Sequence, residues 1–210
     1  MSDILPKYDA IAEVYSAHDY ADAERYYARR AKLIVEHGPR LSPGDTLLDV
    51  ACGDGGLGRH LLERGIDYRG VDASERMVEV ARRALGDRVS PGTFDYVPPE
   101  PVDATSIFRS LYLVPDRPAF LARLRGFTRK KLVFDFDPRA VDGRALLRDV
   151  REAGWSRVET RPFLMPQRAV LPRPLQALLY WVEPTPGSTV LTRVRFPILV
   201  AASVENVNPT

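Results

Sequence analysis

Four glycines follow a short apolar segment of this chain, and that arrangement can hold a small ligand. Residues 46–51 read TLLDVA, which is typical of a buried strand, and residues 53–58 read GDGGLG. Glycine lets the backbone turn tightly and approach another molecule closely, and a helix that begins here directs unpaired N–H groups toward the same place. The pattern predicts a nucleotide-type site. A plain turn is the alternative, although one glycine would be enough for it.

Two kinds of nucleotide fit this loop. Gly53, Gly55 and Gly58 satisfy the dinucleotide fingerprint G-x-G-x-x-G, and Asp72 lies about where an acid would bind ribose hydroxyls in either kind of site. Three features favour S-adenosylmethionine. Asp49 stands inside the strand, where dinucleotide folds usually carry apolar residues. In addition, a helical segment precedes the strand, and the chain ends in a predicted antiparallel hairpin without a second catalytic domain.

The elements that must position this loop alternate between strands and helices. Expected strands are 46–51, 68–72, one that ends near Asp95, 105–114 and 131–137. Expected helices are 22–37, one that ends at Gly65, one from Ser74 to Gly86, one that opens at Asp116, and 142–154. This alternation predicts an α/β fold that is Rossmann-like and doubly wound, with a mostly parallel sheet and helices on both faces.

The end of the chain departs from that alternation. Segments 155–164 and 189–203 are expected strands without a long crossover helix between them, which predicts an antiparallel hairpin at one sheet edge. Pro197 interrupts the second segment and fits an edge or a bulge better than a central strand. A proline-rich insert, 166–187, separates the two, and we expect its middle, 175–182, to form a short helix.

Composition indicates one domain that covers residues 1–210, with 45% hydrophobic and 28% charged residues. Cys52 is the only cysteine, so neither an internal disulfide nor a cysteine-rich metal site is expected. The net charge is +2 and basic residues form no run, so we expect a solvated surface and no nucleic-acid partner. The first residues lack a signal peptide, and the apolar run 198–202 is too short to span a bilayer. We expect a cytoplasmic protein without a membrane partner.

Several segments resemble the class I S-adenosylmethionine-dependent methyltransferases. The first is 47-LLDVACGDGGLG-58, which resembles motif I, although the family usually has Gly at position 51 and Thr or Pro at position 54. Others follow in the family's order: 70-GVDASERM-77, 93-TFDYVP-98 and 107-IFRSLYLVPD-116. The resemblance spans about 8–137. It implies a seven-stranded sheet with the last strand antiparallel beside the fifth, a placement that conflicts with Pro197.

The resemblance also implies where S-adenosylmethionine binds. Asp72, next to Ala73, would accept hydrogen bonds from both ribose hydroxyls, and Met77 would pack on the adenine face. Asp95, next to Tyr96, would accept from the adenine amine.

The glycine loop supplies further expected contacts at Ala51, Gly53 and Gly55. Asp49, inside the strand, is expected to brace this loop through backbone N–H groups rather than to touch the ligand.

The methionine end of this cofactor carries a sulfonium, an ammonium and a carboxylate. Tyr8 and Tyr15 lie in a segment, 8-YDAIAEVYSAHDY-20, that resembles the N-terminal cap of the family, and aromatic faces attract a sulfonium. Arg30, or its neighbour Arg29, is expected to pair with the carboxylate. Arg109 falls at the loop beside the nucleotide, where a Cys, Asn or small residue is commoner. For the tyrosines, ordinary packing of an amphipathic segment is the alternative.

Methyl transfer is an in-line displacement that needs mainly alignment, exclusion of water and sometimes a base. Candidates for the acceptor site are Tyr112, after the fourth strand, and Asp135 and Asp137, at the end of the fifth; a solvated strand end is the alternative reading of the two acids. No third ligand accompanies these acids, so no metal site is expected. His18 and His60 are expected to be surface or helix residues.

Two acceptor classes do not fit. Methyltransferases that act on nucleobase amines carry Asn/Asp-Pro-Pro-aromatic after the fourth strand, whereas 109–112 reads RSLY, and Cys52, within the glycine loop, cannot serve as a nucleophile for pyrimidine carbons. The insert 166–187, with Leu178, Leu179, Tyr180 and Trp181, is expected to roof an apolar pocket. A small, partly hydrophobic metabolite is therefore the expected acceptor. Two alternatives stay open: a non-catalytic S-adenosylmethionine-binding partner subunit and an NAD-dependent reductase.

Overall fold

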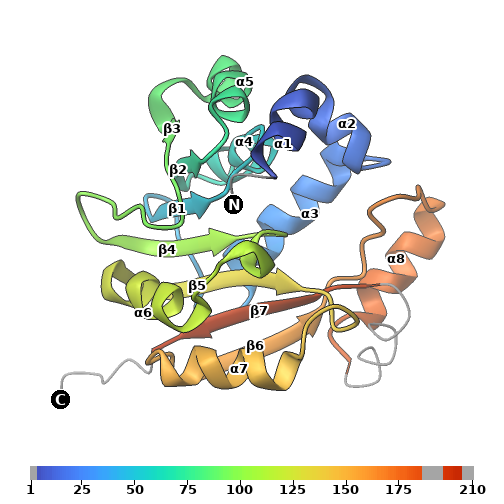
Figure 1. The fold of residues 1–210 in the computed structure, drawn as a ribbon. Helices are drawn as coiled ribbons and strands as arrows, with labels where there is room; N and C mark the ends of the chain where they lie inside the picture. Colours follow the sequence, from blue (N-terminus) through green and yellow to red (C-terminus); the bar gives the residue numbers. More distant parts are fainter. Residues whose placement is uncertain (1–3, 186–195, 205–210) are drawn as a thin grey trace.

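The computed structural model describes residues 4–185 and 196–204, and within them a seven-stranded sheet has the order β3-β2-β1-β4-β5-β7-β6 (Figure 1). Its strands are β1 (Thr46–Val50), β2 (Asp67–Asp72), β3 (Val89–Pro91), β4 (Val102–Ile107), β5 (Thr128–Phe136), β6 (Arg157–Pro162) and β7 (Ile198–Ser203). The first five are parallel, and β7 runs antiparallel to both β5 and β6. The predicted Rossmann-like sheet is confirmed.

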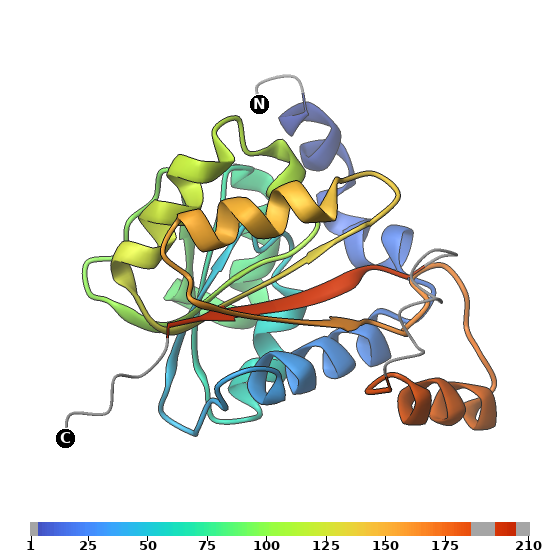
Figure 2. The same ribbon diagram turned by 90° about the horizontal axis from the view of Figure 1, so that it is seen from below.

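Helices cover both faces of the sheet, as predicted (Figure 2). On one face lie α3 (Ala23–Glu36), α4 (Gly56–Leu62) and α5 (Glu75–Leu85), whose apolar side chains pack with Leu47, Tyr68 and Val133. On the other face lie α6 (Arg117–Phe127) and α7 (Gly143–Glu152), which pack with Leu48, Phe134 and Val200. Neighbouring residues of a strand thus serve opposite cores, because successive side chains of a strand alternate in direction.

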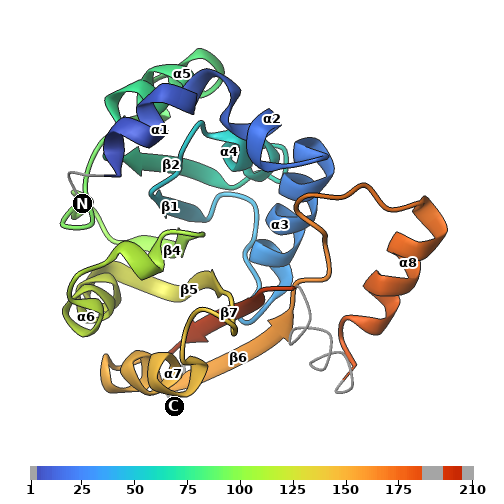
Figure 3. The same ribbon diagram turned by 45° about the vertical axis from the view of Figure 1, so that its right-hand side comes forward.

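The N-terminal segment forms α1 (Leu5–Ile11), the 3₁₀ turn η1 (Ala12–Val14) and α2 (Tyr15–Asp19), and α1 lies beside α5 (Figure 3). Side chains tie the two together: Ser74 donates to Asp9, and Glu13 pairs with Arg76 and Arg83. The cap is thereby held over the end of the sheet where the glycine loop lies. The assignment of residues 1–210 to one domain stays a prediction.

Two strands end earlier than expected. β3 stops at Pro91, short of Asp95, and η2 (Gly86–Arg88) precedes it. β4 stops at Ile107, and Leu111–Leu113 forms the 3₁₀ turn η3 instead of continuing the strand. The reason is a backbone reversal at Arg109, whose φ of 56° cannot belong to a strand.

The C-terminal strands β6 and β7 form the predicted antiparallel hairpin at one edge of the sheet. β7 lies inside the sheet, between β5 and the edge strand β6, as the family resemblance implied. Pro197 precedes the first residue of β7, and its carbonyl accepts from the N–H of Phe163. The expectation that Pro197 requires an edge or a bulge is therefore wrong, since a proline that stands just before a strand removes no ladder hydrogen bond. Residues 189–195 of the expected strand lie outside the described residues.

The insert contains one helix, α8 (Arg173–Val182), which begins slightly before the expected 175–182. In the described parts of the chain, no helix is long and apolar enough to cross a membrane.

Candidate functional site

The glycine loop leaves β1 through three left-handed residues. Ala51, Gly53 and Gly55 have φ values of 59°, 60° and 75°, and α4 then begins at Gly56. A residue with a Cβ in this conformation is strained by roughly 1–2 kcal/mol, and Ala51 stands where the resembling family usually has glycine. In the described residues, Ala51 and Arg109 are the non-glycine positions with positive φ, and both line one cavity. Strain of this kind is typical of ligand sites.

The four glycines of the loop are required for two different reasons, close packing of α4 and access to the cavity. A Cβ at Gly56 would lie 2.4 Å from the ring of Tyr27, and a Cβ at Gly58 would lie 2.6 Å from the ring of Tyr68. A Cβ at Gly55 would lie 2.6 Å from Leu85. These three glycines permit close packing of α4, whereas a Cβ at Gly53 would meet only Tyr15 at an ordinary 3.5 Å and faces the cavity.

Asp72 fastens the loop to the end of β2. Its Oδ2 accepts from the N–H of Gly53 at 2.8 Å, and its Oδ1 accepts from the N–H of Ser74 at 2.9 Å. Each carboxylate oxygen keeps a second lone pair for a ligand hydroxyl. Burial raises the pKa of Asp72, while hydrogen bonds from the backbone N–H groups of Ser74, Gly53 and Ala73 oppose that shift.

Asp49 acts differently from the expectation. It accepts from Ser106 Oγ at 2.6 Å and from the Tyr68 hydroxyl at 3.2 Å, so hydroxyl groups rather than loop N–H groups hold it. The loop N–H at Gly53 goes to Asp72 instead. Burial raises the pKa of Asp49 to about 6.

We call the first cavity the loop cavity. Thirteen residues were assigned from the sequence to the cofactor site, and ten of them line this cavity: Tyr8, Tyr15, Arg30, Asp49, Ala51, Gly53, Asp72, Ala73, Met77 and Arg109. The other three residues, Gly55, Asp95 and Tyr96, do not line the loop cavity.

Asp95 points away from the loop cavity. Its side chain is 80% exposed and pairs with Arg123 at 2.8 Å, while Thr93 and Phe94 line the cavity in this segment. Tyr96 packs against the opposite apolar core. The geometry therefore gives Asp95 no contact with the cavity, because β3 ends at Pro91 and the chain turns before this residue.

Tyrosines of the N-terminal cap form one wall of the loop cavity. The Tyr15 ring lies edge-on to both Tyr8 and Tyr20, with ring centroids 6.2 and 6.4 Å apart. Burial raises the pKa of Tyr8 to about 12 and raises that of Tyr15 further, so both phenols are neutral near pH 7. Sequence reasoning missed Tyr20, although it ends the same aromatic segment, and it missed Phe108 and Leu113 on the other side.

Arg30 and Asp135, expected in separate roles, form a buried ion pair. The Arg30 guanidinium donates to Asp135 Oδ2 at 3.1 Å and to the Tyr26 hydroxyl at 3.0 Å, and it lies 4.2 Å over the Phe108 ring. The other oxygen of Asp135 accepts from the N–H of Arg109 at 2.8 Å. Asp135 thus holds both an arginine of α3 and the strained backbone after β4.

Arg109 stands between two cavities. Its guanidinium donates to Asp19 at 2.8 Å and to the Tyr20 hydroxyl at 3.2 Å. It lines the loop cavity and also a second cavity, which we call the strand-end cavity because it lies after β4 and β5.

The strand-end cavity brings together all three predicted acceptor-site residues, Tyr112, Asp135 and Asp137. Its apolar lining comes from Leu111, Phe136, Val141, Leu146, Met165 and Pro197. Tyr112 is largely exposed and hydrogen-bonds to Tyr8 of the cap. Hydrogen bonds from Arg139 to Asp137, the shorter at 2.6 Å, lower the pKa of that carboxyl.

The insert does not form the expected roof. Of its residues, Gln167 lines the strand-end cavity, but Leu178, Leu179, Tyr180 and Trp181 line neither cavity, because α8 stands to one side of the sheet beyond α3. His60 is buried on α4 near Glu24 and Glu63, and His18 is on α2. Among the described residues, no three His, Cys, Asp or Glu side chains are grouped so that they could hold a metal ion.

Comparison with known proteins identifies the domain. Residues 48–131 match the family model for the methyltransferase domain. Over this segment the chain matches a methyltransferase domain, and its overall fold is that of class I methyltransferases. The matched segment includes the glycine loop and Asp72, and the match agrees with the predicted methyltransferase family and its cofactor, S-adenosylmethionine.

Individual relatives are similar over parts of the chain. A probable fatty acid methyltransferase of Mycobacterium tuberculosis is 37% identical over 67 residues, which are 32% of this chain and 16% of that protein. The chain spans less than a third of the curated relatives it matches, with 16%, 31% and 30% covered.

Solved structures share the fold over more of the chain. One chain of a Haloferax volcanii complex that contains the Trm112 methyltransferase activator has a TM-score of 0.63 at 20% identity, covering 94% of this chain and 97% of that one. The magnesium protoporphyrin IX methyltransferase of Synechocystis, with bound S-adenosylmethionine, has a TM-score of 0.60 at 18% identity, covering 86% and 79%. These similarities concern the fold.

Proposed function

We propose that this chain transfers the methyl group of S-adenosylmethionine to a small, partly hydrophobic acceptor. The observation that carries the proposal is the pair of adjoining cavities that share Arg109 and Ser110. Cofactor in the loop cavity and acceptor in the strand-end cavity would meet at these residues. A displacement at carbon needs such an arrangement, with the nucleophile in line behind the sulfur.

In the loop cavity, Asp72 is proposed to accept hydrogen bonds from the ribose hydroxyls, since it retains lone pairs beside the glycine loop. Met77 is proposed to pack on the adenine face, and the neutral rings of Tyr8 and Tyr15 to face the sulfonium. Arg30 is committed to Asp135, so we assign it a positioning role instead of the carboxylate contact predicted from the sequence.

In the strand-end cavity, the apolar lining supports a partly hydrophobic acceptor. Asp137 is charged near neutral pH and Arg139 lowers its pKa further, so it is suited to anchor a cationic amine by charge rather than to take its proton. Tyr112 lines this cavity and is largely exposed, so it is accessible to an acceptor. Asp135 is enclosed by Arg30 and by the N–H of Arg109, and we assign it to positioning.

Titration calorimetry with S-adenosylhomocysteine and NAD, combined with a methylation assay, tests this function. Asp72→Ala is expected to weaken S-adenosylhomocysteine binding by about 1.5–3 kcal/mol, the scale of lost charge-assisted hydrogen bonds. If Asp72→Ala binds S-adenosylhomocysteine within twofold of the wild-type affinity, Asp72 does not bind the ribose. Tighter binding of NAD would point to the reductase, and binding without turnover on any acceptor would point to a non-catalytic subunit.

A further inference from the structure

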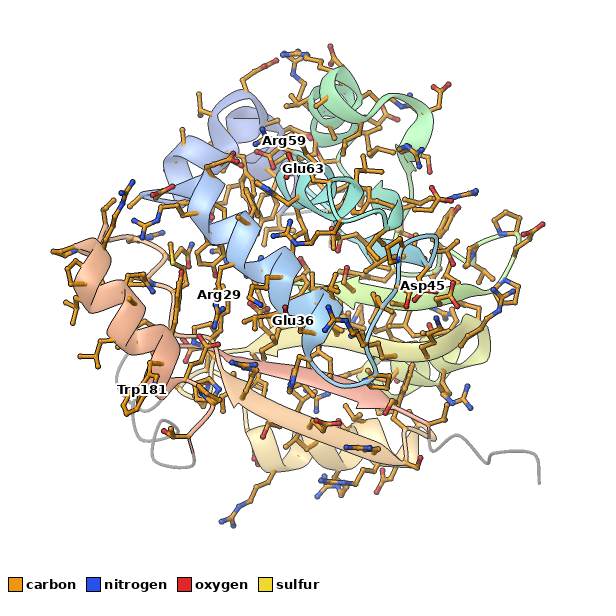
Figure 4. All side chains as sticks on the ribbon, turned by 180° about the vertical axis from the view of Figure 1, so that it is seen from behind. Arg29, Glu36, Asp45, Arg59, Glu63 and Trp181 are labelled. Carbon is orange, nitrogen blue, oxygen red and sulfur yellow. The ribbon has the colours of Figure 1, made fainter. Side chains whose placement is uncertain are left out.

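The helix of the insert, α8, is turned with its apolar side outward. Leu175, Leu178 and Trp181 follow helical spacing along one face and are 44%, 52% and 72% exposed. Gln176 and Glu183, on the opposite face, are 2% and 0% exposed. A surface helix of a globular protein normally buries its apolar face and exposes its polar one. The side chain of Trp181 extends outward from α8 in Figure 4.

Buried polar contacts hold α8 in this orientation. Glu183 accepts from Arg29 at 2.5 Å, from Arg161 at 2.6 Å and from the N–H of Leu164 at 3.1 Å. Gln176 donates to the carbonyl of Leu164 at 3.1 Å. Rotation of the helix to bury its leucines would break these bonds and leave buried charges without partners, which is strongly unfavourable. These tertiary contacts therefore hold the apolar face outward.

The segment that carries this face, residues 166–185, is apolar and cationic among its exposed side chains. Val170, just before α8, is 60% exposed, and the exposed charged side chains between 166 and 185 are Arg168 and Arg173. The one acid in that range is Glu183, which is buried beneath the helix. Apolar side chains that include a tryptophan, together with arginines and no exposed acid, have the chemistry of a helix that lies on an anionic membrane surface.

We propose that the outward face of α8 docks on an anionic lipid surface. The helix would lie in the plane of the interface, with Leu175, Leu178 and Trp181 among the acyl chains and the arginines near lipid phosphates. The sequence alone led us to expect no membrane partner, because that expectation considered only segments that cross a bilayer. Peripheral docking of this kind is independent of the proposed methyl transfer, since α8 lines neither cavity.

The fluorescence of Trp181 can report whether α8 contacts lipid. Its two tryptophans are Trp155, which is fully buried in the sheet core, and Trp181, which is largely exposed on α8. The full chain is mixed with vesicles of phosphatidylcholine, with or without phosphatidylglycerol, and the tryptophan emission and co-sedimentation are measured. We expect a blue shift and quenching by brominated lipids with the phosphatidylglycerol vesicles, and little change with phosphatidylcholine alone. The variant Trp181→Phe should bind and lose the signal.

Variants separate the lipid contact from other occupants of this face. Leu178→Glu combined with Trp181→Glu should weaken vesicle binding by about tenfold or more, because burial of the apolar face supplies much of the affinity. Val97→Glu, at a valine that is 57% exposed in the loop after β3, is the matched control and should bind as wild type does. Circular dichroism and S-adenosylhomocysteine binding verify that each variant folds.

Three results would overturn the proposal. One is the absence of binding to phosphatidylglycerol vesicles. Another is binding that the α8 variants leave unchanged. The third is a dimer or a complex with another protein that covers Trp181 and prevents vesicle binding, as light scattering and acrylamide quenching would detect. Failure of the methylation assay would leave the lipid result unaffected, and the two proposals are therefore tested separately.

Discussion

The two cavities of this domain use their charged groups in different ways. In the loop cavity, Asp72 accepts from the backbone N–H groups of Gly53, in the glycine loop, and of Ser74, at the start of α5. In the strand-end cavity, Asp135 and Asp137 also accept from backbone N–H groups, but charged side chains pair with one another as well, as Asp137 does with Arg139 and Arg117 does with Asp149. A site held by backbone donors depends on one loop conformation and suits one ligand. A site bordered by exchangeable side-chain pairs can change its ligand through single substitutions while the fold persists.

The largest effect is expected for Gly53→Val, which should reduce ligand binding in the loop cavity. The substitution places a β-branched residue at φ 60° beside the loop cavity, so we expect at least about a hundredfold loss of S-adenosylhomocysteine affinity in a protein that still folds. Gly86→Val is the control, because Gly86 has the same φ of 60°, open space around it and no place in either cavity. Retained binding in folded Gly53→Val would show that the loop is only a turn.

Asp135→Ala should lower the free energy of unfolding much more than Asp137→Ala, because the first breaks a buried ion pair and the second an exposed one. Arg30 and Asp135 side chains are 4% and 6% exposed, so loss of the carboxylate leaves a buried guanidinium and should cost about 3–5 kcal/mol of unfolding free energy. Asp137 and Arg139 are 38% and 49% exposed, and Asp137→Ala should cost less than about 1 kcal/mol. Urea unfolding measures both, and equal losses would contradict the distinction.

Asp137→Asn should affect turnover more than cofactor affinity. If the carboxylate anchors the acceptor, kcat should fall by at least about tenfold while S-adenosylhomocysteine binding stays within twofold. Asp142→Asn, at the exposed N-cap of α7 and outside both cavities, provides the control. Full turnover of Asp137→Asn with the true acceptor would mean that this carboxylate does not anchor it.

The smallest expected effect is the contribution of Asp49 to the pH dependence of the free energy of unfolding. Its folded pKa, raised by burial to about 6, exceeds the ordinary value of 3.8, so the folded state binds the proton more tightly than the unfolded state. This residue therefore stabilises the fold as pH falls from about 7 toward 4, by on the order of 1 kcal/mol between pH 7 and pH 5. Asp49→Asn should remove that contribution, which a comparison of urea unfolding at both pH values would reveal. An unchanged difference would contradict the assigned shift.

Much of the loop cavity, the proposed cofactor site, could be predicted from sequence because its residues are local in the chain. The glycine loop directly follows β1, and Asp72 ends the next strand, so adjacent parallel strands bring both to one edge of the sheet. The alternation of strands and helices likewise determined the fold class, since each element carries its own hydrophobic period.

Tertiary structure decided what depends on distant partners. Arg30 and Asp135 are 105 positions apart, and only the packing of α3 against the sheet shows that they neutralise each other. Asp95 looked like a cofactor contact in its motif, yet the early end of β3 turns it to solvent. The orientation of α8 depends on Arg29 and Arg161, which belong to other elements and hold Glu183 inside. A residue pattern specifies which faces of an element are polar, but burial is a property of the neighbours that the fold supplies.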